Sequence, residues 1–122
     1  MKHIFERLPE EFRQNSRTLT QQGVEDIVWP AASIVDVLKA LGTLCVAVLG
    51  GDVYERRGDW FEPTYDSWHC DRAVSESFQV YSQRSVMEAL RYINAHARLR
   101  DAGMFIGLVV TDDLASGFPE SV

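Results

Sequence analysis

The segment from Ala31 to Gly51 places the strongest constraint on the fold, because its apolar pattern changes period once. The first part follows Pro30, stops at Gly42 and has apolar residues at helical spacing, namely Ala31, Ile34, Val35, Leu38 and Leu41. The second part, "LCVAVL" at 44–49, is a continuous apolar run, which is typical of a strand covered on both faces. The sequence therefore predicts a helix over about 31–41 that leads into a buried strand.

Turn signals after this strand predict a β-hairpin. Gly50 and Gly51 interrupt the apolar run, which indicates a bulge or a backbone approached too closely for a side chain. "DVYER" continues as a strand, "RGD" at 57–59 supplies turn residues, and "WFEPTY" returns antiparallel to the first strand. We interpret the RGD tripeptide as turn chemistry and not as an adhesion signal.

Shorter patterns predict the remaining elements. "VEDIVW" at 24–29 reads as a short strand, and "MFIGLVV" at 104–110 as a final buried strand. A capping box that begins at Ser85 predicts the start of a second main helix, and Gly103 its end. A short helix is expected over 8–17, where a proline and two acids stand near the start.

These elements predict an α+β fold, with a mixed or antiparallel sheet of about four strands and two main helices packed on it. The chain has 122 residues, which is enough for one domain with a real core and too few for two. We expect a single domain over 1–122 with its core at about 23–110, and with 1–22 and 111–122 peripheral. The stretch 72–84 carries no clear pattern.

The charge balance restricts the class of partner. Eighteen acids against twelve bases give a formal net charge of −6, which argues against nucleic acid and anionic membranes, because both favour clustered Lys and Arg. An acidic surface would suit a basic partner, although the same charge could simply keep a small protein soluble. No apolar run approaches the roughly 20 residues that span a bilayer, and the first residues do not resemble a signal peptide. With two cysteines and no disulfide framework, we expect a cytoplasmic protein.

No metal and no cofactor is predicted. Zinc sites need closely spaced pairs of ligands, whereas the candidates here are scattered and Cys45 falls in an expected core strand: His3, Cys45, His69, Cys70 and His96. His69 and Cys70 are adjacent, and neighbouring side chains on a strand point to opposite faces, so we expect no catalytic thiolate–imidazole pair. The chain has no glycine-rich phosphate-binding motif.

The predicted hairpin region combines large aromatic residues with acids, which is typical of a surface that grips a basic protein. Aromatic side chains supply rigid contact area, and surrounding carboxylates steer the partner and fix its register. About half of the aromatics could instead pack the core under the hairpin. The predicted partner-binding residues are Asp52, Tyr54, Glu55, Asp59, Trp60, Glu62, Tyr65, Asp66 and Trp68.

The same stretch leaves a catalytic alternative open. A small hydrolase or ligand-binding enzyme could have its site over Gly51–Asp71, with Asp52, Asp66 and His69 as the acid–base candidates. Nothing in the spacing selects one pair among the six nearby acids, so binding is favoured over catalysis. Convergence of these side chains in one concave pocket would favour the enzyme, and a flat or convex acidic face would favour the binder.

The order of elements resembles the immunity protein 40 family of bacterial polymorphic-toxin systems. The resemblance rests on the helix before the apolar strand, on "LGGDVY" at Leu49–Tyr54 and on "PTYDSWHCD" at Pro63–Asp71, and it spans roughly residues 23–110. It implies a small cytosolic protein, encoded beside a toxin, that binds the toxin and blocks it without being an enzyme. Motif residues shared by a family, here Gly50, Gly51, Asp52 and Trp68, can build the fold while less distinctive neighbours carry specificity.

Overall fold

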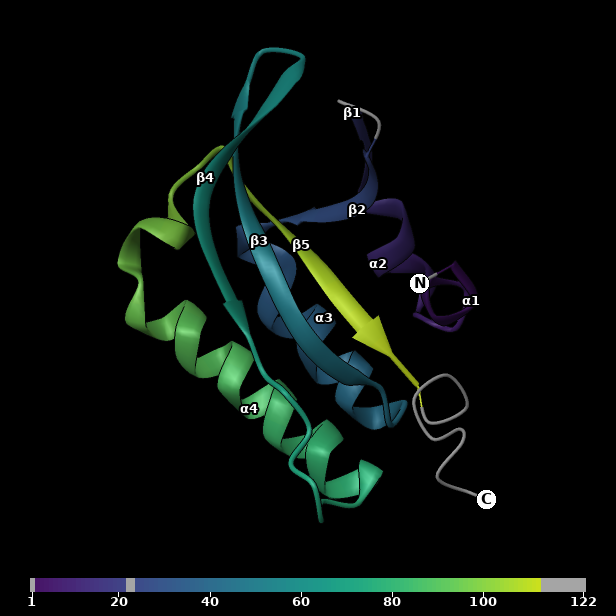
Figure 1. The fold of residues 1–122 in the computed structure, drawn as a ribbon. Helices are drawn as coiled ribbons and strands as arrows, with labels where there is room; N and C mark the ends of the chain where they lie inside the picture. Colours follow the sequence, from purple (N-terminus) through teal and green to yellow (C-terminus); the bar gives the residue numbers. More distant parts are fainter. Residues whose placement is uncertain (1, 22–23, 113–122) are drawn as a thin grey trace.

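A computed structural model describes residues 2–21 and 24–112 of the chain (Figure 1). The elements in chain order are α1 (Lys2–Phe5), α2 (Glu10–Gln14), β1 (Arg17–Gln21), β2 (Val24–Pro30), α3 (Ala31–Thr43), β3 (Ala47–Arg57), β4 (Trp60–His69), α4 (Phe78–Ala95), the 3-10 helix η1 (Ala97–Arg100) and β5 (Met104–Thr111).

The strands form one sheet in the order β1-β2-β5-β3-β4, and each neighbouring pair is antiparallel. The protein is therefore α+β, as predicted, and within the described residues the sheet has five strands where about four were expected. The additional strand is β1, "RTLTQ", which lies at one edge of the sheet. It was missed because Leu19 is its only apolar residue, too weak a signal for a strand.

The helices pack on one face of the sheet, and none of the helices in residues 2–21 and 24–112 lies on the other face. Met104, Ile106 and Leu108 alternate along β5 and join α3 and α4 in the main core. The residues between them point to the opposite face, which we call the open face. At one end of the open face Leu19, Val28 and Phe105 form a small cluster of their own. In Figure 1, α3 lies behind β3 and β5, and the tip of the β3–β4 hairpin rises at the top.

The helix predicted over 31–41 is confirmed as α3, whose Ile34, Leu38 and Leu41 are fully buried. The helix includes Gly42 and ends at Thr43, so the prediction that Gly42 stops it was wrong. The expectation that Cys45 lies in the core was also wrong, because Cys45 is exposed, with a φ of +57° in the turn before β3.

The second main helix begins earlier than predicted. Ser77 is its N-cap, accepting a hydrogen bond from the Val80 N–H, and the helix runs to Ala95, well before Gly103. Ser85 is therefore not a cap but a buried residue inside α4, where its Oγ accepts a hydrogen bond of 2.8 Å from the Val48 N–H. The hydroxyl of Ser82, also buried, donates a hydrogen bond of 2.8 Å to the Val46 carbonyl. Two buried serines therefore connect α4 to the start of β3.

The stretch 72–84 forms the approach to α4 and its first two turns. Arg84 organises it: the guanidinium donates to the Glu76 carboxylate at 2.7 Å, to the Asp71 carbonyl at 2.6 Å and to Cys70 Sγ at 3.2 Å. The hydrogen bond from Arg84 lowers the pKa of Glu76 to about 2. One arginine thus fixes the link between β4 and α4.

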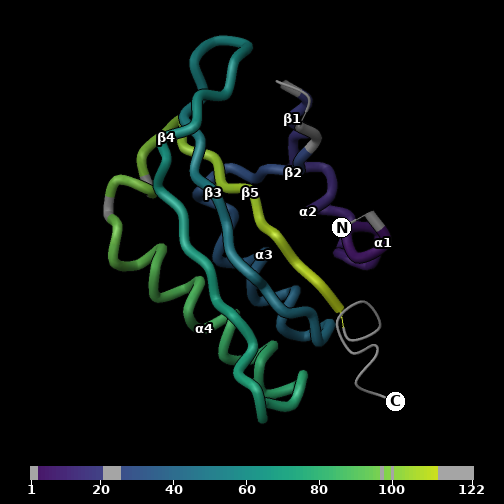
Figure 2. Tube along the Cα trace, in the orientation of Figure 1, coloured from purple at the N-terminus to yellow at the C-terminus, as the bar shows by residue number. Residues whose placement is uncertain are grey.

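Residues 1–22, expected to be peripheral, contribute Ile4, Leu8 and Leu19 to buried clusters. The helix expected over 8–17 is the shorter α2. The Trp29 indole N–H donates to the Phe12 carbonyl at 2.9 Å, and His3 Nε2 lies 2.9 Å from Asp112 Oδ2. The first contact joins β2 to α2, and the second holds α1 beside the end of β5, as the trace in Figure 2 shows. Of the tail expected over 111–122, residues 113–122 lie outside the described part of the chain.

Candidate partner-binding surface

The base of the hairpin is built around the two glycines, as their sequence predicted. Pairing between β3 and β5 shifts register between Val48 and Gly50, which is a β-bulge. A Cβ atom on Gly50 would lie 3.1 Å from the His69 Cα, and one on Gly51 would lie 2.7 Å from Trp68 Cζ3 and 2.9 Å from the Gly107 carbonyl oxygen. Neither position has room for a side chain.

Trp68, one of the predicted partner-binding residues, faces the helices at this base. Its ring covers Gly51 and stacks on Tyr92 of α4, with ring centroids 4.9 Å apart. Its indole N–H is inaccessible to solvent and has no hydrogen-bond partner among the described residues. Trp68 is half-buried and joins the edge of the sheet to α4.

The tip of the hairpin carries four of the predicted residues. The predicted turn is present, with Gly58 at a φ of +62°. The guanidinium of Arg57 lies 3.0 Å from Glu55 Oε1 and 2.6 Å from Glu62 Oε1, so one cation neutralises both carboxylates in part. Asp59 is exposed in the turn, and Trp60 is 41% exposed beside it.

A second irregularity in the hairpin displays Tyr65. The β3–β4 register shifts between Asp52 and Tyr54, and Tyr65 there has a φ of +67° and is 89% exposed. The Thr64 hydroxyl holds this bulge by donating to the Val53 carbonyl at 3.1 Å and accepting from the Asp66 N–H at 3.2 Å. Tyr65 therefore projects into solvent, while the Asp66 carboxylate lies 3.6 Å from Arg98.

Asp52 and Tyr54 lie on the open face. Asp52 is exposed and stands directly opposite Gly107 of β5, and Tyr54 is half-buried against the Leu19–Val28–Phe105 cluster. Asp26 of β2 reaches over the same glycine from the other side: a Cβ on Gly107 would lie 2.6 Å from its Oδ2. Two carboxylates therefore flank one glycine across three adjacent strands.

The environment of this acidic pair shifts two pKa values. Burial raises the pKa of Asp26 above its ordinary value, the charge of Asp52 raises it further, and a 2.8 Å hydrogen bond from the Ile27 N–H opposes the rise. Burial also raises the pKa of Tyr54, and the charges of Asp26 and Asp52 add to that rise. The three side chains thus form one electrostatic group.

A shallow hollow adjoins this group on the open face. It is lined by Leu49, Gly50, Gly51, Asp52, Ser67, Trp68, His69, Asp71 and Val109. Two of the acid–base candidates for an enzyme, Asp52 and His69, therefore share a concave site, but the third, Asp66, does not line the hollow and lies 3.6 Å from Arg98. The three candidates do not converge.

His69 and Cys70 point to different surroundings, as expected. His69 is exposed, whereas Cys70 is buried beneath Arg84, and burial raises the pKa of its thiol. Among residues 2–21 and 24–112, no three His, Cys, Asp or Glu side chains gather where they could hold a metal ion. In the same part of the chain, no helix is both long and apolar enough to cross a bilayer.

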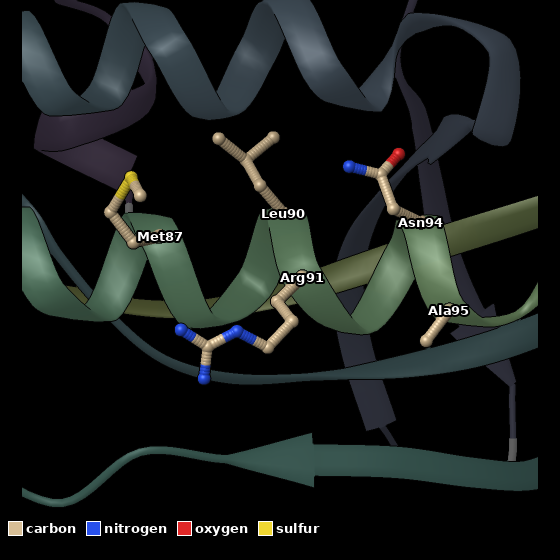
Figure 3. Close-up of a pocket in the computed structure, with 5 residues that line it drawn as sticks. All are labelled: Met87, Leu90, Arg91, Asn94 and Ala95. Atoms are coloured by element: carbon tan, nitrogen blue, oxygen red, sulfur yellow. The ribbon is translucent and has the colours of Figure 1, made fainter.

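Another concave region lies on the outer side of α4. Met87, Leu90 and Asn94 point toward α3, while Arg91 and Ala95 point away from it (Figure 3). Met87 is 61% exposed, and Arg91 is paired with Glu88 at 2.8 Å. This region contains none of the predicted partner-binding residues.

The nine predicted residues therefore fall into four settings: the open face, the tip, the Tyr65 bulge and the helix-facing base. Sequence reasoning missed Asp26 and Gly107, which complete the open-face group. A signal for Asp26 was present, since Glu25 and Asp26 are carboxylates in the strand "VEDIVW", whose other residues are apolar. Its proximity to Asp52 depends on β5 lying between β2 and β3, which the order of elements along the chain does not reveal.

Comparison with known proteins supports the resemblance seen in the motifs. No curated protein and no solved structure matches the chain. The family model of immunity protein 40 matches residues 18–110, which include every strand except part of β1 and β5, both main helices and both hairpin motifs. Because this match covers most of the sequence, the chain belongs to the immunity protein 40 family.

Proposed function

We propose that this protein binds the domain of a cognate bacterial toxin and neutralises it by stoichiometric occlusion, without catalysing a reaction. Membership of the immunity protein 40 family carries the proposal. The partner is a basic toxin domain, the complex forms in the cytoplasm, and no cofactor takes part. The net charge of −6 favours fast association with a basic surface.

The β3–β4 hairpin supports this function as the principal contact region. Trp60 and Tyr65 are large aromatic side chains that stand exposed on it, and aromatic residues of this kind dominate the energetics of protein interfaces. Asp59 and Glu62 are exposed acids beside them that can steer a basic surface toward the tip. The aromatic Trp68 acts differently, since it supports the hairpin from the helix side.

A growth assay tests the function directly. The reading frame beside this protein's gene is expressed in a bacterial host, with and without the protein, and the two products are then purified together. We expect toxicity that the protein relieves, and a stable complex of the two chains. Toxicity relieved without a complex would contradict occlusion and favour the enzyme alternative, for which Asp52 and His69 in one hollow would be the first residues to replace.

Charge reversal at the tip tests the contact region. Asp59→Lys combined with Glu62→Lys should slow association with the toxin by about tenfold or more, since steering charges act mainly on the association rate. The fold should survive because both side chains are exposed. Stopped-flow or surface-plasmon-resonance kinetics at low and high salt measure the effect. Unchanged association kinetics would place the interface elsewhere on the protein.

A further inference from the structure

The acids on the hairpin differ in whether a cation of the protein already neutralises them. At the tip, Glu55 and Glu62 share Arg57, and in the Tyr65 bulge Asp66 lies near Arg98. On the open face, no Lys or Arg whose side chain the structure describes forms an ion pair with Asp26 or Asp52. Asp59 in the turn also has no ion pair among the described residues, but it is a single acid, whereas the open face presents two neighbouring carboxylates to a cation from outside.

The Asp26 carboxylate reaches across β5 toward Asp52. β2 and β3 lie on either side of β5, so their backbones are about 10 Å apart, and because Gly107 has no side chain the Asp26 Oδ2 lies over it. Asp52 stands directly opposite Gly107 on the neighbouring strand and is exposed. A planar guanidinium or an ammonium that enters from solvent between Asp26 and Asp52 would contact both.

The surface next to the pair suits the aliphatic part of the same side chain. Val109 of β5 is 50% exposed and lines the hollow together with the backbone of Gly50. Lys and Arg side chains commonly lay their methylene groups on such apolar surface while the charged end reaches a polar site. Val109 lies on the open face beside the two acids, two residues along β5 from Gly107, since Asp52 pairs with Gly107 and Gly50 with Val109.

We propose that the open face is a docking surface for the toxin, and that it receives an arginine or lysine side chain of the toxin between Asp26 and Asp52, with its methylene groups on Val109. This inference rests on the proposed function and makes it more specific, since it assigns the charged contact to the sheet and adds Asp26 to the interface. Charge complementarity supports it, and no helix of the described part of the chain covers this face. In the free protein the neighbouring carboxylates of Asp26 and Asp52 repel each other, and Asp26 is half-buried. A bound cation would offset this repulsion.

Matched double variants test the site with the toxin domain that co-purifies with the protein. Asp26→Asn combined with Asp52→Asn removes the open-face charges, and Glu55→Gln combined with Glu62→Gln removes the same number at the tip. We expect the first variant to weaken toxin binding by about tenfold or more, and to lower its dependence on salt, because it removes one side of a close charge pair. The second should weaken binding less than threefold, because Arg57 already neutralises these two acids in part.

A second matched pair tests the apolar part of the site. Val109→Ser should weaken binding severalfold, whereas Val80→Ser, on an equally exposed valine of α4, should leave it unchanged. Isothermal titration calorimetry measures affinity, and a thermal melt of each variant checks the fold. If the Asp26/Asp52 double variant does not fold, Asp52→Asn alone serves, because Asp52 is exposed.

The outcomes separate the two proposals. If the parent protein does not bind the toxin, the proposed function fails and the open-face site fails with it. If the parent binds and the Asp26/Asp52 variant binds within threefold of it, immunity stands and the open-face site is overturned. Loss of affinity in the open-face variants alone supports the site.

Discussion

The tip of the hairpin and the open face of the sheet are both acidic, but their carboxylates stand in different surroundings. At the tip, Arg57 lies within 3.0 Å of both Glu55 and Glu62, and each of the three side chains is about half exposed. On the open face, Asp26 is half-buried, its neighbour Asp52 carries the same charge, and Gly107 separates them. A count of acids along the sequence treats these regions as equal, whereas in the structure an arginine pairs with the two glutamates at the tip and no described Lys or Arg side chain pairs with Asp26 or Asp52.

The largest expected effect is at Gly51, which lies at the base of the hairpin directly before Asp52. Gly51→Val should destabilise the protein by about 1–3 kcal/mol, because a side chain there collides with the Trp68 ring and with the Gly107 carbonyl. A urea melt measures the change. Gly58→Ala at the tip is the control: its Cβ meets nothing within 4 Å, so it should lose only the roughly 1 kcal/mol of a left-handed backbone. Equal stability of Gly51→Val and the parent would mean that the hairpin base is not closely packed.

A smaller effect of opposite sign is expected at Asp26. The pKa of Asp26 is raised in the folded state, so its ionisation destabilises the folded protein. This destabilisation is absent below the pKa of the unfolded state and is fully present above the pKa of the folded state. Asp26→Asn should therefore stabilise the protein at pH 7, by less than about 1 kcal/mol after solvent screening. The gain should vanish near pH 3. The asparagine can still accept the Ile27 N–H, and the other groups facing it, Asp52 and Tyr54, are unchanged.

Thermal melts of the parent and the Asp26→Asn variant between pH 3 and pH 8 measure this difference. Asp36→Asn on the exposed side of α3 is a suitable control for the loss of one negative charge. A gain that is equal at pH 3 and pH 7, or equal in the control, would show that the repulsion between Asp26 and Asp52 is negligible.

The smallest expected effect is at the tip. Arg57→Ala removes two exposed ion pairs, which typically contribute 0–1 kcal/mol, so stability should fall by less than about 1 kcal/mol. The substitution leaves Glu55 and Glu62 without their cation, and it should therefore speed association with a basic toxin. Association kinetics across a salt series check this. A slower association would indicate that Arg57 itself contacts the toxin.

The elements with strong local patterns were predictable from the sequence. Helix α3 and the hairpin followed from periodicity and from turn residues, and the close approach at Gly50 and Gly51 followed from their place inside an apolar strand. The start of α4 was not found, because the Ser85 pattern imitates a capping box while the cap is Ser77 in a stretch without apolar period. Local chemistry alone does not separate the two.

The arrangement of the candidate site was less predictable, for a different physical reason. Asp26, Asp52 and Gly107 are far apart in the sequence and meet only because β5 lies between β2 and β3. The pairing of Arg57 with its two glutamates depends on the register of β3 and β4 at the turn. Whether a carboxylate is paired with a cation of the protein thus depends on strand order and register, and the apolar periodicity of the sequence specifies neither.

The packing of the N-terminal helices has a practical consequence for anyone who shortens this protein. The family match begins at residue 18, yet Ile4 and Leu8 lie in the main core and the Phe12 carbonyl is the acceptor for the Trp29 indole. A fragment trimmed to the family boundaries would expose part of its own interior and leave a buried indole N–H without its acceptor. An expression fragment should therefore keep the first helices.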